Sequence, residues 1–199
     1  MGETPVTVAA YKRFLKERPE LDLQLPEPPT FNPGWSKEHQ PIVRVTWDQA
    51  QAYCAWAGET RGRLPTEAQW EYAARGGKDG LRYPWGNEIT PGNANYEGSP
   101  WKGASPVRTY LPNAWGLYDM AGNVWEWVED RYDNDYAAQP PDKLVDDPLG
   151  QDHGSGDRVM RGGSCFRGPS DLRVSARGKR TPTATGHSIG FRCVVEVAP

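Results

Sequence analysis

Glycine and proline constrain this chain more than any other feature, because 22 Gly and 19 Pro make up over a fifth of its 199 residues. Glycine readily adopts positive φ and proline interrupts helices, so this density favours a compact, loop-rich fold over a helical bundle. The length fits one domain with a sizeable core, and nine Trp argue against disorder. We therefore expect a single domain over residues 1–199.

Capping signals predict three short helices. The first lies in "TVAAYKRFLKERP" and ends before its proline. The stretches 46–58 and 66–77 each open on Thr with Gln three residues later, which is a capping box, and each closes on glycine in a position that favours a left-handed cap. The segment Leu21 to Gln40 has no periodicity and is expected to be an ordered surface loop.

Two strands are expected near the end of the chain, after a turn-rich and aromatic stretch from Leu81 to Arg131. They are "RVMRGGS" and "SIGFRCVVEV". In the second strand apolar residues recur with a period of two, which predicts one buried face. That face would carry Ile189, Phe191, Cys193, Val195 and Val197.

Three cysteines are an odd number at irregular spacing, which favours free thiols in a reducing compartment. Cys54 falls on the apolar face of its helix and Cys193 on that of its strand, so both are expected in the core. With no signal peptide visible, the sequence predicts a cytoplasmic protein. The net charge of −3 and the lack of a long apolar run give no reason to expect nucleic-acid or membrane binding.

Seven motifs carry a family resemblance: "VTVAAYKRF", "PIVRVTWDQAQAYCAW", "RLPTEAQWEYAARGG", "YPWGN", "GLYDMAGNVWEW", "RGGS" and "IGFRC". In this order they resemble the formylglycine-generating-enzyme-like domains, also called sulfatase-modifying-factor domains. The resemblance covers nearly the whole chain. It implies an α+β, C-type-lectin-like fold that is rich in loops, with short helices and small antiparallel sheets.

The resemblance leaves three activities open. The formylglycine-generating oxidases act on a peptide cysteine and hold copper with two cysteines five positions apart, because two thiolates suit the soft monovalent ion. The matching interval from Cys165 to Ala176 holds one cysteine and is about three residues shorter, so the catalytic pair is absent. Iron-dependent sulfoxide synthases need a histidine motif, and His39, His153 and His187 are scattered.

The third activity is ligand display by the variable protein of a diversity-generating retroelement. The segment from Arg161 to Arg192 is similar to the region that those proteins diversify, and rewritten codons there cannot encode Lys, Glu, Gln, Met or Trp. These five types make up 37 of the first 164 residues but only one of residues 165–188, where about five are expected by proportion. The bias supports a diversified, non-catalytic binding domain, with an oxidase or a non-diversified accessory domain as the alternatives.

This hypothesis predicts an exposed ligand-binding patch between the two strands. Residues 165–188 carry a net charge of +4, which favours an acidic protein or other macromolecular partner. Neighbouring arginines would also lower the pKa of the Cys165 thiol, although no base accompanies it. The predicted patch comprises Cys165, Phe166, Arg167, Ser170, Asp171, Val174, Gly178, Lys179, Arg180, Thr181, Thr183, Ala184, His187 and Ser188.

No cofactor is required by this hypothesis, but the resemblance implies structural calcium. Its ligands would be Asn123 and Glu126 in "GNVWEW" and Asn95 with Tyr96 in the preceding loop, since hard oxygen ligands suit this ion. Alternatively, Asn123 caps a turn between packed tryptophans. Arg173 and Arg177 are equally open between patch and buried framework.

Overall fold

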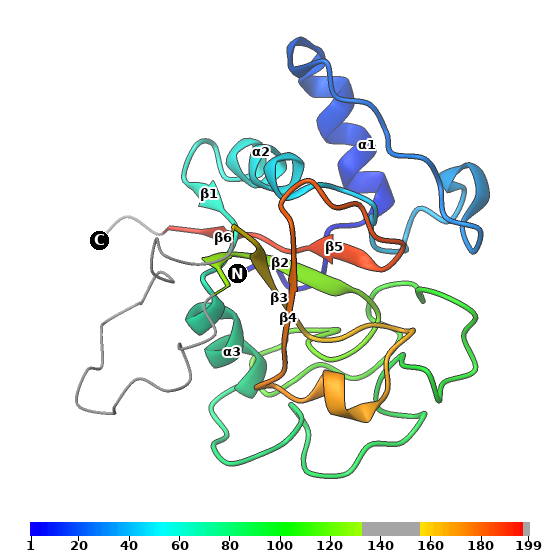
Figure 1. Cartoon of the computed structure of the whole chain (residues 1–199), viewed down its shortest axis with the longest axis vertical. Coiled ribbons are helices and arrows are strands. Elements are labelled where there is room, and N and C mark those ends of the chain that lie inside the picture. The colour runs from blue at the N-terminus through cyan, green and yellow to red at the C-terminus, as the bar shows by residue number, and fades with distance from the viewer. Residues whose placement is uncertain (133–155, 197–199) are drawn as a thin grey trace.

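The computed structural model describes residues 1–132 and 156–196, and Figure 1 shows their arrangement. His153 and Val197 of the sequence predictions lie outside these ranges. The helices are α1 (Val8–Glu17), α2 (Trp47–Ala57) and α3 (Glu67–Arg75), with short 3-10 turns η1 (Pro19–Leu21), η2 (Pro33–Trp35) and η5 (Pro169–Leu172). The strands are β1 (Gly62–Arg63), β2 (Trp125–Arg131), β3 (Arg158–Arg161), β4 (Arg177–Arg180), β5 (Ile189–Phe191) and β6 (Val194–Val195).

The three predicted helices are confirmed, and local capping explains them. In α2 the Thr46 hydroxyl accepts the backbone N–H of Gln49 while the Gln49 side chain accepts that of Thr46, and α3 opens on the same reciprocal box. Gly76 ends α3 in the left-handed conformation, as predicted. None of the helices in the described ranges is long and apolar enough to cross a bilayer.

The end of α2 differs from the prediction of a left-handed cap. Gly58 has a φ of −104°. Glycine is required there by close approach instead, because a Cβ atom on Gly58 would lie 2.5 Å from the backbone of Gly62. The turn that follows α2 therefore packs directly on the helix end, where no side chain fits.

A four-stranded sheet in the order β4-β3-β2-β5 forms the centre of the molecule, and β1 pairs with β6 in a second, two-stranded sheet. Strand β2 pairs antiparallel with β3 and parallel with β5. It was not predicted, because its first four residues, Trp125 to Val128, are all buried and so show no alternation of apolar and polar positions. Strand β4 was also missed, since its sequence "RGKR" carries no apolar side chain.

The prediction of one continuous strand over residues 188–197 is wrong. The chain leaves the large sheet after Phe191 and joins the small one at Val194, so the run is divided between β5 and β6. The side chain of Arg192, expected on the polar face, is completely buried, whereas Val195 is 46% exposed. An ion pair to β2, described below, holds Arg192 in the interior and overrides the alternation.

The sheet separates two apolar clusters. Trp127 of β2 packs with α1 and α2, whereas the next residue, Val128, packs with Trp70 of α3. Figure 1 shows the same layering, with α1 and α2 on one side of the sheet and α3 with the loops of residues 78–122 on the other. The apolar contacts of both faces thereby fix β2, which explains why consecutive residues of this strand are buried.

The prediction of three free thiols is wrong. Cys54 of α2 and Cys193, in the link between β5 and β6, form a disulfide with their Cα atoms 5.4 Å apart and 139 positions apart in sequence. Both side chains lie in or against the core, as expected, but they meet there. Of the three cysteines, Cys165 alone is a free thiol. The prediction of a reducing compartment therefore loses its support, because it assumed that all three cysteines were free.

Replacing both bridged cysteines tests the disulfide. The double variant Cys54→Ala/Cys193→Ala should lose about 2–5 kcal/mol of unfolding free energy, because the cross-link restricts the unfolded chain. Urea unfolding followed by tryptophan fluorescence measures the loss. As a control, the unreduced wild-type protein should expose one titratable thiol on unfolding. Three titratable thiols would contradict the disulfide.

Candidate ligand-binding surface

Buried arginines anchor the segment that was predicted to bind a ligand. Arg161, at the end of β3, is fully buried and donates to the carbonyls of Val174 (2.7 Å) and Ala176 (2.6 Å). It also pairs with Glu71 of α3 and approaches Glu67 at 3.5 Å, while burial lowers its pKa. These bonds hold the loop after η5 against the strand that precedes it.

A second arginine joins β4 to the same helix. Arg177 donates from Nε and from a terminal nitrogen to the two carboxylate oxygens of Glu67, at 2.7 and 2.8 Å. Glu67 is only 2% exposed, so this bidentate pair is well protected from water. Of the two arginines left open by the sequence, Arg177 is therefore framework, whereas Arg173 is exposed and donates to the carbonyl of Ser170.

The far end of the segment is fixed by Arg192. Its guanidinium donates to both oxygens of Glu126, at 2.7 and 2.8 Å, and to the carbonyl of Tyr118 at 2.8 Å. The Trp70 indole N–H donates to the same carboxylate at 2.7 Å. Arg192 and Glu126 are each at most 1% exposed, so charge and hydrogen bonds are satisfied inside the protein.

Between these anchors, most of the predicted patch reaches the surface, but it does not do so as one unit. The exposed members are Phe166, Arg167, Ser170, Lys179, Arg180, Thr181, Thr183 and His187, which we call the exposed set. Asp171, Gly178, Ala184 and Ser188 are half-buried, and Cys165 and Val174 are buried. In Figure 1 the chain around η5 lies below the sheet, and the connection from β4 to β5 rises toward α2. The exposed set therefore forms a strip along β4 with a group at each end.

Cys165 contradicts the prediction of an exposed thiol whose pKa neighbouring arginines would lower. Its side chain is 4% exposed, and its backbone N–H donates to the carbonyl of Asn123. Burial raises the pKa of the Cys165 thiol to about 12, since no neighbouring charge offsets the loss of hydration. The arginines nearby in sequence point elsewhere, as Arg161 does toward α3, so the thiol is neutral and structural.

Val174 and Gly178 are unsuited to a variable surface for packing reasons. Val174 belongs to the apolar cluster of Trp70 beneath α3. A Cβ atom on Gly178 would lie 3.2 Å from the Trp125 ring and 3.3 Å from Met160, which is closer than ordinary contact. Packing therefore restricts which side chains fit at Val174 and Gly178, which lie among the exposed positions of the strip.

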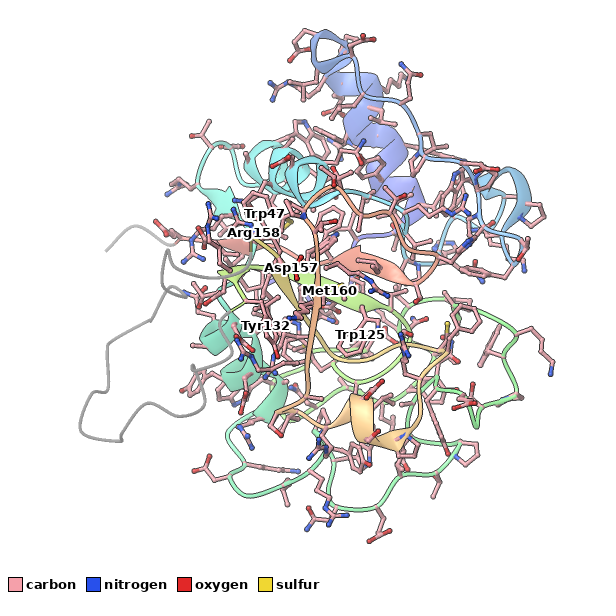
Figure 2. The ribbon with its side chains drawn as sticks, viewed as in Figure 1. Trp47, Trp125, Tyr132, Asp157, Arg158 and Met160 are labelled. Carbon is pink, nitrogen blue, oxygen red and sulfur yellow. A yellow bond between two sulfur atoms is a disulfide. The ribbon has the colours of Figure 1, made fainter. Side chains whose placement is uncertain are left out.

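Aromatic rings beside β3 and β4 hold the cations of this region. Figure 2 shows the labelled side chains gathered around these strands. The Arg158 guanidinium lies 3.9 Å from the centroid of Trp47, and the Lys179 ammonium lies 4.6 Å from that of Tyr132. Both distances fall in the range of cation–π attraction, so these long side chains are partly ordered before any ligand arrives.

The sulfatase-modifying factor enzyme 1-like domain matches residues 1–197 of this chain. The chain belongs to this family. Its fold is accordingly the α+β, C-type-lectin-like fold of formylglycine-generating-enzyme-like domains, as the resemblance implied.

Relatives of this sulfatase-modifying-factor domain carry different names. The formylglycine-generating enzyme of Streptomyces coelicolor is 42% identical over 174 residues, which cover 79% of this chain and 53% of that protein. The serine/threonine-protein kinase Pkn1 of Chlamydia trachomatis is 45% identical over 84% of this chain, but the match covers 26% of the kinase. The chain thus spans about half of the first relative and a quarter of the second.

Two solved structures share the fold over nearly the whole chain. Treponema denticola variable protein 1 superposes with a TM-score of 0.79 and 25% identity, covering 96% of this chain and 82% of that one. PvdO from Pseudomonas aeruginosa superposes with a TM-score of 0.81 and 29% identity, covering 97% and 78%. The neighbours therefore include a variable protein, and the sequence relatives include formylglycine-generating enzymes.

Within this family, copper binding by a pair of thiolates does not fit the present residues. Cys54 and Cys193 are joined to each other, and Cys165 is buried and protonated. A soft monovalent metal needs two thiolate ligands, which this chain does not offer in one place.

The residues predicted to bind calcium are also committed to other contacts. The Asn123 side-chain oxygen accepts the backbone N–H of Ser105 at 3.0 Å, and the Asn95 amide donates to the carbonyl of Gly103 at 2.9 Å. Asn123 has a φ of +62°, so it serves as the predicted turn cap. Tyr96 packs in an apolar cluster and Glu126 is neutralised by Arg192, so these residues do not fit a calcium site as a set.

The glutamates Glu67 and Glu71 are framework residues that sequence reasoning missed. They stand one turn apart on α3 and receive Arg161 and Arg177 from the opposite part of the chain. The available signal was the pair of acidic residues in "TEAQWEYAAR", on a helix whose other residues are mostly apolar. Because their partners lie about a hundred positions away, spacing alone could not reveal the pairing.

The burial of Cys165 predicts that it resists alkylation. At pH 8 the folded protein should react with iodoacetamide at least about 100-fold more slowly than the urea-unfolded protein, because the thiolate is scarce and shielded. Mass spectrometry of timed samples measures both rates, and the unreduced Cys54–Cys193 bridge serves as the internal control. Equal rates would refute the buried assignment.

The buried Arg192–Glu126 pair predicts that replacing Arg192 destabilises the fold more than replacing an arginine of an exposed ion pair. Arg192→Leu should lower the free energy of unfolding by about 3–5 kcal/mol, because it leaves a buried carboxylate without its counter-charge. The matched control is Arg13→Leu, which removes an exposed pair with Glu17 and should cost less than about 1 kcal/mol. Urea denaturation measures both, and similar losses would contradict the anchoring role.

Proposed function

We propose that this domain is a non-catalytic ligand-binding domain whose contacts are made by the exposed set. The observation that carries this proposal is the contrast within one segment. Arg161, Arg177 and Arg192 form ion pairs with buried or half-buried carboxylates, whereas the eight side chains of the exposed set, which lie between Arg161 and Arg192, reach solvent. A surface presented on a fixed frame loses little conformational entropy when it binds.

The proposal includes diversification of this surface by a retroelement. Two observations support it: the similarity to a protein named variable protein 1, and the scarcity of five residue types in residues 165–188. Rewriting is tolerable only where a side chain faces solvent, because changes in a packed core cost stability. We therefore restrict the diversified positions to the exposed set and leave out Cys165, Val174 and Gly178.

The partner is proposed to be acidic. Arg167, Lys179 and Arg180 are exposed cations of the strip. The carboxylate of Asp171 lies 3.8 Å from the Arg167 guanidinium, which is close to the limit of an ion pair. Such charges chiefly steer association and select partners. The proposal needs no cofactor and no membrane or nucleic-acid partner. The cytoplasmic location stays a prediction from the sequence, and the Cys54–Cys193 disulfide argues against it.

A formylglycine-generating oxidase is the second candidate, favoured by the 42% identity to an enzyme of that name. To test it, the protein is incubated with copper(I), oxygen and a cysteine-containing peptide, and conversion of the thiol to an aldehyde is followed by mass spectrometry. Binding without catalysis predicts no conversion above that of a Cys165→Ser control. Turnover that depends on Cys165 would overturn the non-catalytic proposal.

The diversification proposal predicts a pattern in the surrounding DNA. A near copy of the segment encoding Arg161 to Arg192 should lie beside a reverse-transcriptase gene and should differ at adenines. The differences should fall in codons of the exposed set and spare those of Cys165, Val174 and Gly178, whose side chains or Cα atoms are packed. Sequencing the flanking region checks this, and differences at the packed positions would contradict it.

Display libraries test the binding role directly. One library randomises the exposed set, and a matched library randomises the eight exposed positions from Arg13 to Glu27, both included. We expect the first to keep the wild-type melting temperature within a few degrees and to yield at least about 10-fold more binders to an immobilised acidic protein. Equal yields of binders from the two libraries would contradict the proposal that the exposed set is the ligand-binding surface.

A further inference from the structure

A groove of residues that lie outside the segment from Arg161 to Arg192 adjoins the exposed set. Two cavities, of about 480 and 310 Å³, are both lined by Ser36, Lys37, Gln40 and Trp101. The first continues along residues 38–39 to Pro106 and the second along Thr30, Phe31 and residues 102–104. Because four residues line both of them, the two cavities lie side by side, and we call the pair the Trp101 groove.

The Trp101 groove is continuous with the proposed ligand surface at one side chain. The ring of Phe31, which lines it, lies 6.2 Å from the ring of Phe166, a 48% exposed member of the exposed set. Phe31 is seated against Gly103, where a Cβ atom would come within 2.3 Å of the ring. A ligand on Phe166 that extends past Phe31 therefore enters this groove.

Trp101 supplies an apolar anchor for such a ligand. Its side chain is 38% exposed, although a tryptophan has a large apolar surface that is costly to hydrate. A partly exposed tryptophan is typical of positions that dominate binding free energy.

The charge of the groove is positive. Lys37 and Lys102 are exposed on its walls, and no carboxylate of residues 1–132 or 156–196 lies within ion-pair distance of either. Lys37 donates to a backbone carbonyl, that of Phe31, at 2.7 Å. The one acidic lining residue, Glu38, is paired with Lys12 at 2.7 Å. The groove thus offers two cations to the carboxylates of a ligand.

We infer that the Trp101 groove binds an extended, acidic peptide segment of the partner, which contacts Trp101 with an apolar side chain and Lys37 and Lys102 with carboxylates. This inference rests on the proposed binding function and names its partner class. A peptide offers both apolar side chains and carboxylates at alternating positions of one strand. A long polyanion such as nucleic acid lacks the apolar side chain and meets a protein with a net charge of −3.

Anisotropy titration with labelled peptides tests the inference. The probe is a fluorescein-labelled ten-residue peptide of alternating Glu and Leu, and its matched control carries Gln in place of every Glu. We expect the acidic peptide to bind at least about 10-fold more tightly than the neutral one, and the double variant Lys37→Glu/Lys102→Glu to remove that preference. Trp101→Ala should weaken the binding of both peptides about 10-fold.

Two controls separate the groove from net charge and from the exposed set. Lys16→Glu/Lys78→Glu makes the same charge change at exposed sites elsewhere and should leave the affinity within twofold. Arg167→Glu probes the strip. Loss of affinity with Lys16→Glu/Lys78→Glu, loss with Arg167→Glu alone, or no binding to the wild type would each overturn the groove inference. The display libraries would still decide whether the strip itself binds ligands, so the two failures are distinguishable.

Discussion

The buried ion pair between Glu126 and Arg192 is the interaction on which the rest of this domain depends. It joins the centre of β2 to the residue directly after β5, and Trp70 of α3 donates to the same carboxylate. One charge pair therefore sets the position of the central strand, of its parallel neighbour and of the helix beneath them. Since a buried charge is stable only with its partner, the segment before Arg192 must return to the same place whatever its own sequence.

How much of this could be read from the sequence depended on the range of each interaction. The helices were predictable because their caps are local, as the Thr46–Gln49 box shows. Strand β2 was not, since burial on both faces removes the period of two. The Cys54–Cys193 bridge and the break after Phe191 also escaped, because each is decided by a contact across more than sixty positions.

The candidate surface shows the same division between local and distant causes. Its location between two strands and its exposed residues follow from the family motifs and from the polarity of the segment. The inward direction of Cys165 and Val174 does not, because it comes from packing against residues of the preceding loops and of α3. The Trp101 groove was equally hidden, since Trp101 and Phe31 are distant in sequence and line one cavity only in the folded chain, where Phe31 also contacts Phe166.

The parallel pairing of β2 with β5 has a further consequence for the connection between β4 and β5. The register of β5 is fixed by its bonds to β2 and by the Arg192 anchor, and that of β4 by its bonds to β3. Neither depends on how many residues lie between them, and Thr183 and Thr185 at the middle of the connection are exposed. The surface of this domain can therefore vary in the length of a loop as well as in its side chains, which would change the shape of the binding surface without disturbing the sheet.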